Sequence, residues 1–94
     1  MIRHIVMWKF QEGTRERAEE FLCRLAALEG LIPCIRAMRV LRSAEEGSAY
    51  DAVLIADFDS LEAVRQYKDD PRHRAVSALC KEIRTDRRAI DVTL

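Results

Sequence analysis

The sequence has 94 residues, 49% of them hydrophobic and 34% charged, which suits one small globular domain over residues 1–94 and excludes a disordered chain. Sixteen basic and sixteen acidic residues cancel, so the chain lacks the basic surface of proteins that bind nucleic acid or an anionic membrane. No stretch approaches the roughly 20 apolar residues of a membrane helix, and the first residues form no signal peptide, so we expect a soluble cytoplasmic protein.

Residues 2–10 (IRHIVMWKF) alternate with the two-residue period of a β-strand. Ile5 and Met7 make the middle of one face apolar, so neither side of this strand is fully solvated. The other face combines four apolar side chains with a histidine. It consists of Ile2, His4, Val6, Trp8 and Phe10.

Apolar residues then recur at three- and four-residue spacing, which predicts a helix over residues 15–29. Thr14 precedes this helix as a candidate N-cap, and Gly30 suits the left-handed position that ends many helices. A second strand is predicted over residues 34–42, and the charges at its ends are typical of an edge strand.

A third strand is predicted over residues 49–58, which are apolar on both faces and therefore suit the centre of a sheet. Asp59 and Glu62 match the reciprocal capping pattern of a helix that runs through Tyr67. The predicted elements up to this point are thus strand, helix, strand, strand and helix.

The stretch from Tyr67 to His73 contains a break in the helical pattern. Pro71 lacks a backbone donor and has a fixed φ, so a helix cannot pass through it undisturbed. Asp70 is therefore a natural N-cap, and Pro71 the first residue of a new helix that extends to about residue 83. Tyr67 closes one helix and His73 lies in the first turn of the next, so a phenol and an imidazole lie near a sharp bend.

Residues 87–94 alternate again and predict a last strand, after a basic run at 84–88 that we interpret as a solvated turn. The order β-α-β-β-α-β predicts an α+β ferredoxin-like fold, a four-stranded antiparallel sheet with helices on one face. The first and third strands are then central, and their second apolar faces need a cover that this chain does not supply. We therefore expect a homodimer that buries sheet against sheet.

Three segments carry a resemblance to a known family: IRHIVMWKF, LIPCIRAMRV and AYDAVLIADFDSLEAVRQYKDDPRH. The last is the most specific, with an aromatic-ended strand, a Ser-capped helix and the pattern Tyr-x-x-x-Pro-x-His. On these segments the chain resembles the stress-responsive A/B barrel (Dabb) family of dimeric α/β-barrel proteins. The resemblance implies a ferredoxin-like protomer that pairs through its sheet into a barrel-like dimer.

One plant member of that family is a polyketide cyclase that closes a linear tetraketide by intramolecular aldol condensation. The resemblance implies that Tyr67 and His73 match its catalytic pair and that His4 matches a pocket histidine. Ala52 and Leu25 stand where that enzyme has a histidine and a pocket tyrosine. Some plant members also bind magnesium through backbone carbonyls, and the matching positions here are Glu29, Ile32 and Ile35.

The residues themselves predict no metal site and no cofactor. The two histidines lie on different elements, and neither has a carboxylate at ligand spacing on its own face. The three glycines stand too far apart for a phosphate-binding loop. Cys23, Cys34 and Cys80 lack the close spacing of a zinc or redox motif and are interpreted as free buried thiols.

The predicted chemistry centres on His73. An imidazole near its ordinary pKa can accept a proton at neutral pH, as abstraction α to a carbonyl requires. The Tyr67 hydroxyl can orient that base or donate a hydrogen bond to a developing enolate. With His4, these groups suit a small apolar or phenolic ligand that has one oxygenated end. The apolar residues expected to line the cleft are Val6, Trp8, Phe21, Leu25 and Leu54.

Three functional hypotheses follow. The first is a cyclase- or isomerase-like enzyme in which His73, Tyr67 and His4 are catalytic and no redox cofactor takes part. The second is a non-catalytic small-molecule-binding or stress-associated dimer, which the alanine at position 52 favours. The third is a cofactor-free monooxygenase of the same architecture that acts on a phenolic substrate.

Overall fold

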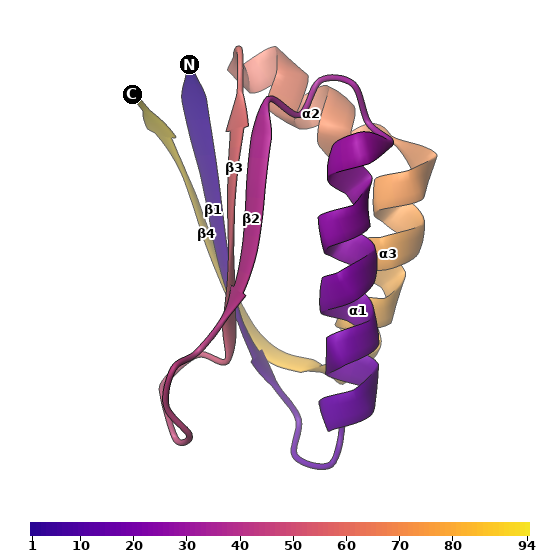
Figure 1. Cartoon of the computed structure of the whole chain (residues 1–94), viewed down its shortest axis with the longest axis vertical. Helices are drawn as coiled ribbons and strands as arrows, with labels where there is room; N and C mark the ends of the chain where they lie inside the picture. The colour runs from indigo at the N-terminus through magenta and orange to yellow at the C-terminus, as the bar shows by residue number, and fades with distance from the viewer.

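The computed structural model describes all 94 residues as one sheet with helices on one of its faces (Figure 1). Its strands are β1 (Ile2–Phe10), β2 (Ala37–Arg42), β3 (Ala52–Phe58) and β4 (Arg84–Thr93). Its α-helices are α1 (Arg15–Ala27), α2 (Leu61–Asp69) and α3 (Pro71–Ile83), and a 3-10 helix spans Leu28–Gly30.

The sheet has the strand order β2-β3-β1-β4, and all neighbouring strands are antiparallel. β1 and β3 are central, and β2 is an edge strand. The predicted α+β ferredoxin-like class is therefore confirmed. The two termini lie side by side (Figure 1), where the Leu94 amide donates to the Met1 carbonyl at 3.1 Å.

The hydrophobic core lies between the sheet and the helices. Alternate residues of β1 and β3 face the apolar stripe of α1, and burying each large apolar side chain contributes roughly 1.5–3 kcal/mol. Trp8 packs edge-on against Phe21, with ring centroids 5.2 Å apart. Each of the large aromatic residues Trp8, Phe21, Phe58 and Tyr67 is buried.

The end of α1 differs from the prediction, because Gly30 does not adopt the left-handed conformation. The α-helix stops at Ala27 and tightens into the 3-10 turn, in which the Leu28 carbonyl accepts bonds from the amides of Leu31 and Ile32 at 3.0 and 2.9 Å. This turn satisfies the terminal carbonyls that a left-handed glycine otherwise serves.

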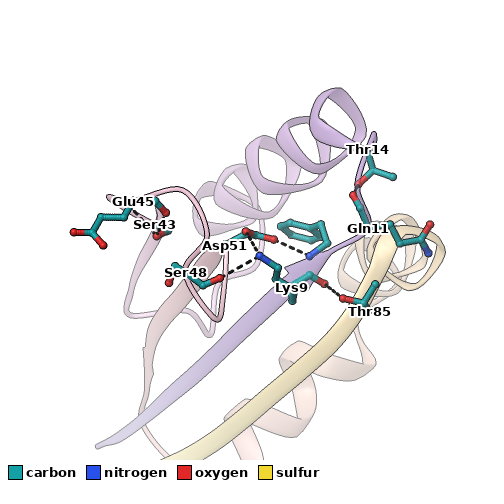
Figure 2. Close-up of polar contacts among 9 residues, drawn as sticks. Lys9, Gln11, Thr14, Ser43, Glu45, Ser48, Asp51 and Thr85 are labelled. Atoms are coloured by element: carbon teal, nitrogen blue, oxygen red, sulfur yellow. Dashed lines mark hydrogen bonds and ion pairs between the residues drawn. The ribbon is translucent and has the colours of Figure 1, made fainter.

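β2 and β3 both begin three residues later than predicted. β2 starts at Ala37 because the Ile35 amide turns back to the Ile32 carbonyl at 3.2 Å. β3 starts at Ala52, and the side chain of the preceding residue, Asp51, contacts the end of β1. Its carboxylate accepts bonds from the Phe10 amide at 2.8 Å and from Lys9 Nζ at 3.1 Å (Figure 2).

β4 begins at Arg84, directly after α3, so the interpretation of residues 84–88 as a solvated turn is wrong. The pairing of β4 with β1 is regular up to Lys9 opposite Asp86, then shifts so that Phe10 lies opposite Arg84. The intervening Thr85 is the extra residue of this bulge, and its hydroxyl donates to the Lys9 carbonyl at 3.3 Å (Figure 2).

The predicted corner between α2 and α3 is confirmed. Asp70 is the N-cap of α3, with its Oδ1 accepting from the Arg72 amide at 2.8 Å, and Pro71 is the first helical residue. The cap of α2 is Ser60, whose hydroxyl oxygen accepts from the Ala63 amide at 3.1 Å. The predicted cap Asp59 instead forms an ion pair with Arg36, which is why it does not turn toward the helix.

The face of the sheet opposite the helices carries an apolar patch that nothing covers. The Ile90 side chain in this patch is 59% exposed. No helix of the structure is both long and apolar enough to cross a membrane. The apolar residues of this open face are Ile5, Met7, Leu41, Val53, Ile55, Ile90 and Val92.

The three cysteines are free thiols, but they are not all buried. Cys80 is buried and Cys34 half-buried, whereas Cys23 is exposed on α1. The prediction of three buried thiols is therefore wrong for Cys23, which lies outside the apolar stripe of its helix.

Candidate functional site

A cavity of about 40 Å³ lies between the sheet and the helices. The eight residues predicted as catalytic or ligand-binding all line it, so the fold brings together residues from β1, β3, α1, α2 and α3. Four further residues line the cavity that the sequence did not indicate. The predicted residues are His4, Val6, Trp8, Phe21, Leu25, Leu54, Tyr67 and His73; the further ones are Ser77, Cys80, Arg84 and Arg87.

A second, wider hollow of about 500 Å³ adjoins this cavity on the outside. The two share part of their lining, so the small inner cavity and the larger outer hollow are direct neighbours. No hydrophobic residue lines the outer hollow. The shared residues are His4, His73, Ser77 and Arg87, and the outer hollow adds Lys68, Arg74 and Lys81.

His73 lies in the first turn of α3, where its ring bridges the corner between the two helices. Its Nδ1 lies 3.1 Å from the Lys68 carbonyl oxygen in the last turn of α2. Because a carbonyl only accepts hydrogen bonds, Nδ1 carries the proton and Nε2 keeps a lone pair. Burial lowers the pKa of His73 below its ordinary value, so the ring is neutral at neutral pH.

His4 has a carboxylate partner that the sequence did not reveal. Its side chain is almost fully buried, and Nδ1 lies 2.6 Å from Oδ1 of Asp91. An ionised carboxylate only accepts, so His4 Nδ1 also carries the proton and its Nε2 is the free acceptor. Burial lowers the pKa of His4 more than Asp91 raises it, and this ring too is neutral.

The spacing of carboxylates along the element of each histidine could not reveal Asp91, because it reaches His4 from another strand at the far end of the chain. It lies directly opposite His4 in the β1–β4 pairing. The alternation of the last strand places Asp91 on the same face as Arg87, but only the register of two strands 87 residues apart brings it to His4. Knowledge of that register, together with the alternation, would have placed both Arg87 and Asp91 at the site.

Tyr67 is completely buried, and its hydroxyl is the one buried side-chain polar atom without a hydrogen-bond partner. Its ring centroid lies 4.4 Å from that of His73 and 6.2 Å from that of His4. Burial raises its pKa, so the phenol stays protonated and is a hydrogen-bond donor. A buried hydroxyl without a partner costs about 1–3 kcal/mol, so its presence calls for an explanation.

The site therefore combines one phenolic donor with two neutral imidazoles, each with a free Nε2, against an apolar wall. The inner cavity has room for roughly three water molecules. That space suits a carbonyl and the carbon next to it, while the rest of a ligand occupies the outer hollow. Such a set can accept a proton from carbon and donate a hydrogen bond to an oxygen anion.

The two positions that differ from the plant cyclase have different surroundings. Leu25 lines the cavity as one of its apolar walls. Ala52 is buried opposite Trp8 and does not line the cavity. The lining therefore has a hydrocarbon where that enzyme has a pocket tyrosine.

The positions that match a magnesium site have other partners. The Glu29 carboxylate accepts from the Met38 amide at 2.9 Å, and the Ile32 carbonyl accepts from the Ile35 amide at 3.2 Å. No group of three or more His, Cys, Asp or Glu side chains is placed to hold a metal. The chemistry proposed for the cavity uses no metal ion.

The fold and this lining define a ferredoxin-like α+β protein with a small cavity between its sheet and its helices. Two imidazoles and a phenol line this cavity. Residues 2–94 match the family model of the stress responsive A/B barrel domain (Dabb). The chain belongs to this family.

Several proteins of known sequence or structure are similar over nearly the whole chain. A dimeric ferredoxin-like protein of unknown function from Bacteroides fragilis is 26% identical, with a TM-score of 0.89 over 99% of this chain and 95% of that one. Another from Thermobifida fusca is 28% identical, with a TM-score of 0.87 over 99% of this chain and 90% of that one. An uncharacterised protein from Streptomyces coelicolor is 29% identical over 89 residues, which are 90% of this chain and 92% of that protein.

Proposed function

We propose that the protein binds a small carbonyl compound in the cavity and removes a proton α to the carbonyl, with His73 Nε2 as the base. The observation that carries this proposal is the buried Tyr67 hydroxyl, which lacks a partner on a ring that lies beside both imidazoles. A carbonyl oxygen in the cavity supplies the acceptor that this donor lacks. The function is thus that of a cyclase- or isomerase-like enzyme without a redox cofactor.

The step moves one proton and one electron pair. His73 Nε2 takes the α-proton, the C–H electron pair forms the enolate double bond, and the oxygen anion accepts the Tyr67 hydrogen bond. In an isomerisation, the imidazolium returns the proton to another carbon. In a ring closure, the enolate carbon attacks a second carbonyl of the same molecule, and the resulting alkoxide takes the proton.

His4 acts in this scheme as a second neutral acceptor whose orientation is set by Asp91. The short bond from Nδ1 to the carboxylate fixes the ring and its tautomer. His4 Nε2 is then available to a hydroxyl group or to the enol form of the ligand. Asp91 is a positioning residue, because it contacts His4 and does not line the cavity.

We also propose that the protein is a homodimer built through the open face of its sheet. The Bacteroides fragilis and Thermobifida fusca proteins are both described as dimeric. The seven apolar residues of the open face form a patch of the kind that monomers rarely expose. Three free thiols accord with a reducing compartment, and we place the protein in the cytoplasm.

Proton exchange tests the enzymatic proposal. We expect the protein to catalyse exchange of the α-protons of pentan-2-one with D2O, followed by NMR. The His73→Ala variant should lose roughly 100-fold or more of this rate, within the usual range for a general base. Arg65→Gln, on the same side of the corner but outside the cavity, should exchange like the unaltered protein.

The non-catalytic hypothesis keeps one observation in its favour, the hydrocarbon of Leu25 where the plant cyclase has a tyrosine. Under that hypothesis pentan-2-one shifts the resonances of Tyr67 and His73, but no exchange exceeds that of buffer. This result would replace the enzyme by a carbonyl-binding dimer.

A further inference from the structure

We propose that the ligand of this site is an organic anion, with its carbonyl in the inner cavity and its charged group in the outer hollow. This inference rests on the proposed function for the carbonyl end and adds the chemical class of the rest of the ligand. The residues that would bind the anion are Lys68, Arg74, Lys81 and Arg87.

The lining of the outer hollow is strongly cationic in a chain that is neutral as a whole. Four of its seven residues are lysine or arginine, and none is aspartate or glutamate. The formal net charge of the chain is zero, so this concentration of one sign is local. A concave surface of one sign attracts ligands of the other.

Most of these cations lack a partner within the chain. Nine of the 16 lysines and arginines form ion pairs, which leaves seven without one. Four of those seven line the cavity or the hollow: Lys68, Lys81, Arg84 and Arg87. Arg74 reaches Asp69 only at 3.4 Å, and both side chains are largely exposed, so this pair competes weakly with a ligand.

Arg87 connects the two compartments, because it lines both. It lies opposite Trp8 in the β1–β4 pairing, on the same face of β4 as Asp91, whose carboxylate contacts His4. A guanidinium binds carboxylate or phosphate through two parallel hydrogen bonds. A ligand anion held by Arg87 therefore has its neighbouring carbons within reach of the inner cavity.

The volumes agree with this division of the ligand. The inner cavity of about 40 Å³ admits a group the size of an acetyl, and the outer hollow of about 500 Å³ is as large as many small-molecule sites. No hydrophobic residue lines the outer hollow, so a charged body has more partners there than an uncharged hydrocarbon body has. A charged or strongly polar body is what this surface recognises.

Three probes with the same methyl ketone end test the proposal: pentan-2-one, 4-oxopentanoate and 3-oxobutylphosphonate. By NMR titration we expect the two anions to bind at least about tenfold more tightly than the neutral ketone, as one charge-assisted contact provides. Added salt should weaken the binding of the two anions and leave the binding of pentan-2-one unchanged. A preference for the phosphonate identifies a phosphate-bearing ligand, and a preference for 4-oxopentanoate identifies a carboxylic acid.

The variants Lys68→Gln, Lys81→Gln and Arg87→Gln should each lower the ratio of anion to ketone affinity, by about threefold to tenfold. Arg65 lies on α2 near Lys68, also lacks an ion pair and lies outside both compartments, so Arg65→Gln is the matched control. Because the readout is a ratio, a variant that only loosens the cavity weakens every probe and leaves the ratio unchanged.

Equal affinity for all three probes, or an equal loss in Arg65→Gln, overturns the anion site. Proton exchange without anion preference leaves the proposed function standing and removes this inference. Anion preference without proton exchange removes the proposed function and leaves the anion site standing. The two failures are therefore distinguishable.

Discussion

Tyr67 and Tyr50 are the two tyrosines of the chain, and their hydroxyls have opposite surroundings. The Tyr50 hydroxyl donates to Oδ2 of Asp86 at 3.0 Å in a partly exposed position. The Tyr67 hydroxyl is buried without a partner. One hydroxyl therefore stabilises the fold, while the other is a cost that the proposed ligand would offset.

Replacing each tyrosine by phenylalanine should change stability in opposite directions. Tyr67→Phe removes an unsatisfied buried hydroxyl and should raise the free energy of unfolding by about 1 kcal/mol, while carbonyl binding and exchange fall. Tyr50→Phe should lower the free energy of unfolding by about 1 kcal/mol. Urea unfolding followed by circular dichroism measures both. If Tyr67→Phe destabilises the protein as much as Tyr50→Phe does, the hydroxyl has a structural partner and the proposed role is wrong.

The two buried histidines predict how stability depends on pH. The pKa of each is lowered in the folded protein from the ordinary 6.5, chiefly by burial, so the unfolded chain binds more protons below that pH. The free energy of unfolding should therefore be highest above about pH 6.5 and fall as pH decreases toward 5. Urea unfolding at a series of pH values measures the slope.

A double variant, His4→Gln with His73→Gln, is the control for this pH dependence and should flatten the curve between about pH 5 and 7. The perturbed carboxylates do not contribute in that window. The pKa of Asp70, for example, is lowered to about 2 by Arg72, so its stabilisation is lost only as pH falls through that lower range. An unchanged slope in the double variant would show that other groups titrate.

Among the elements, the corner between α2 and α3 is the one that positions His73, the proposed base. Asp70 caps α3, Pro71 starts it, and the His73 ring then hydrogen-bonds back to the last turn of α2. The orientation of the imidazole is thus a property of the corner and not of either helix alone.

Removing the cap should loosen this corner. Asp70→Ala should lower the free energy of unfolding by about 1 kcal/mol, the usual worth of an N-cap. It should also reduce proton exchange, because the first turn of α3 frays around His73. Asp69→Ala, next to it but exposed and in a 3.4 Å ion pair, should change stability by less than about 0.5 kcal/mol. Equal losses at the two positions would mean that the cap does not act as described.

The elements were predictable where a repeating pattern defines them. β1, α1 and the α2–α3 corner follow from alternation, from helical spacing and from Pro71. The contacts that the Asp51 carboxylate, just before β3, makes with the end of β1 were not predictable. Side-chain contacts between distant segments leave no mark on local periodicity.

The residues of the candidate site were also predictable only in part. His4, Tyr67 and His73 were identified because they stand out on apolar faces or at a helix break and because a family pattern includes them. Asp91 and Arg87 were missed because they enter through the register of the last strand against the first. The prediction thus found the inner cavity and missed the cationic hollow outside it.

For the whole molecule, the open face of the sheet predicts association. Light scattering at micromolar concentration should give the mass of a dimer. Ile90→Glu places a charge in the apolar patch, on the edge strand β4 opposite Ile5, and should yield a monomer, since an unpaired buried charge in an interface costs several kcal/mol. Leu61→Glu is the matched control, because Leu61 is also a large exposed apolar residue, 46% exposed, but lies on the helix side. A dimer that survives Ile90→Glu would place the interface elsewhere.

Because of the bulge between β1 and β4, the effect of deleting a residue from β4 depends on where the residue lies. Arg84 and Arg87 are three residues apart, yet both line the cavity because Thr85 is supernumerary in the pairing. A deletion of Thr85 keeps both arginines in phase, whereas any deletion between Arg87 and Asp91 sends these two to opposite faces. Variants of this chain can therefore lose Thr85, and few other residues of β4, without moving side chains from the cavity to the open face of the sheet.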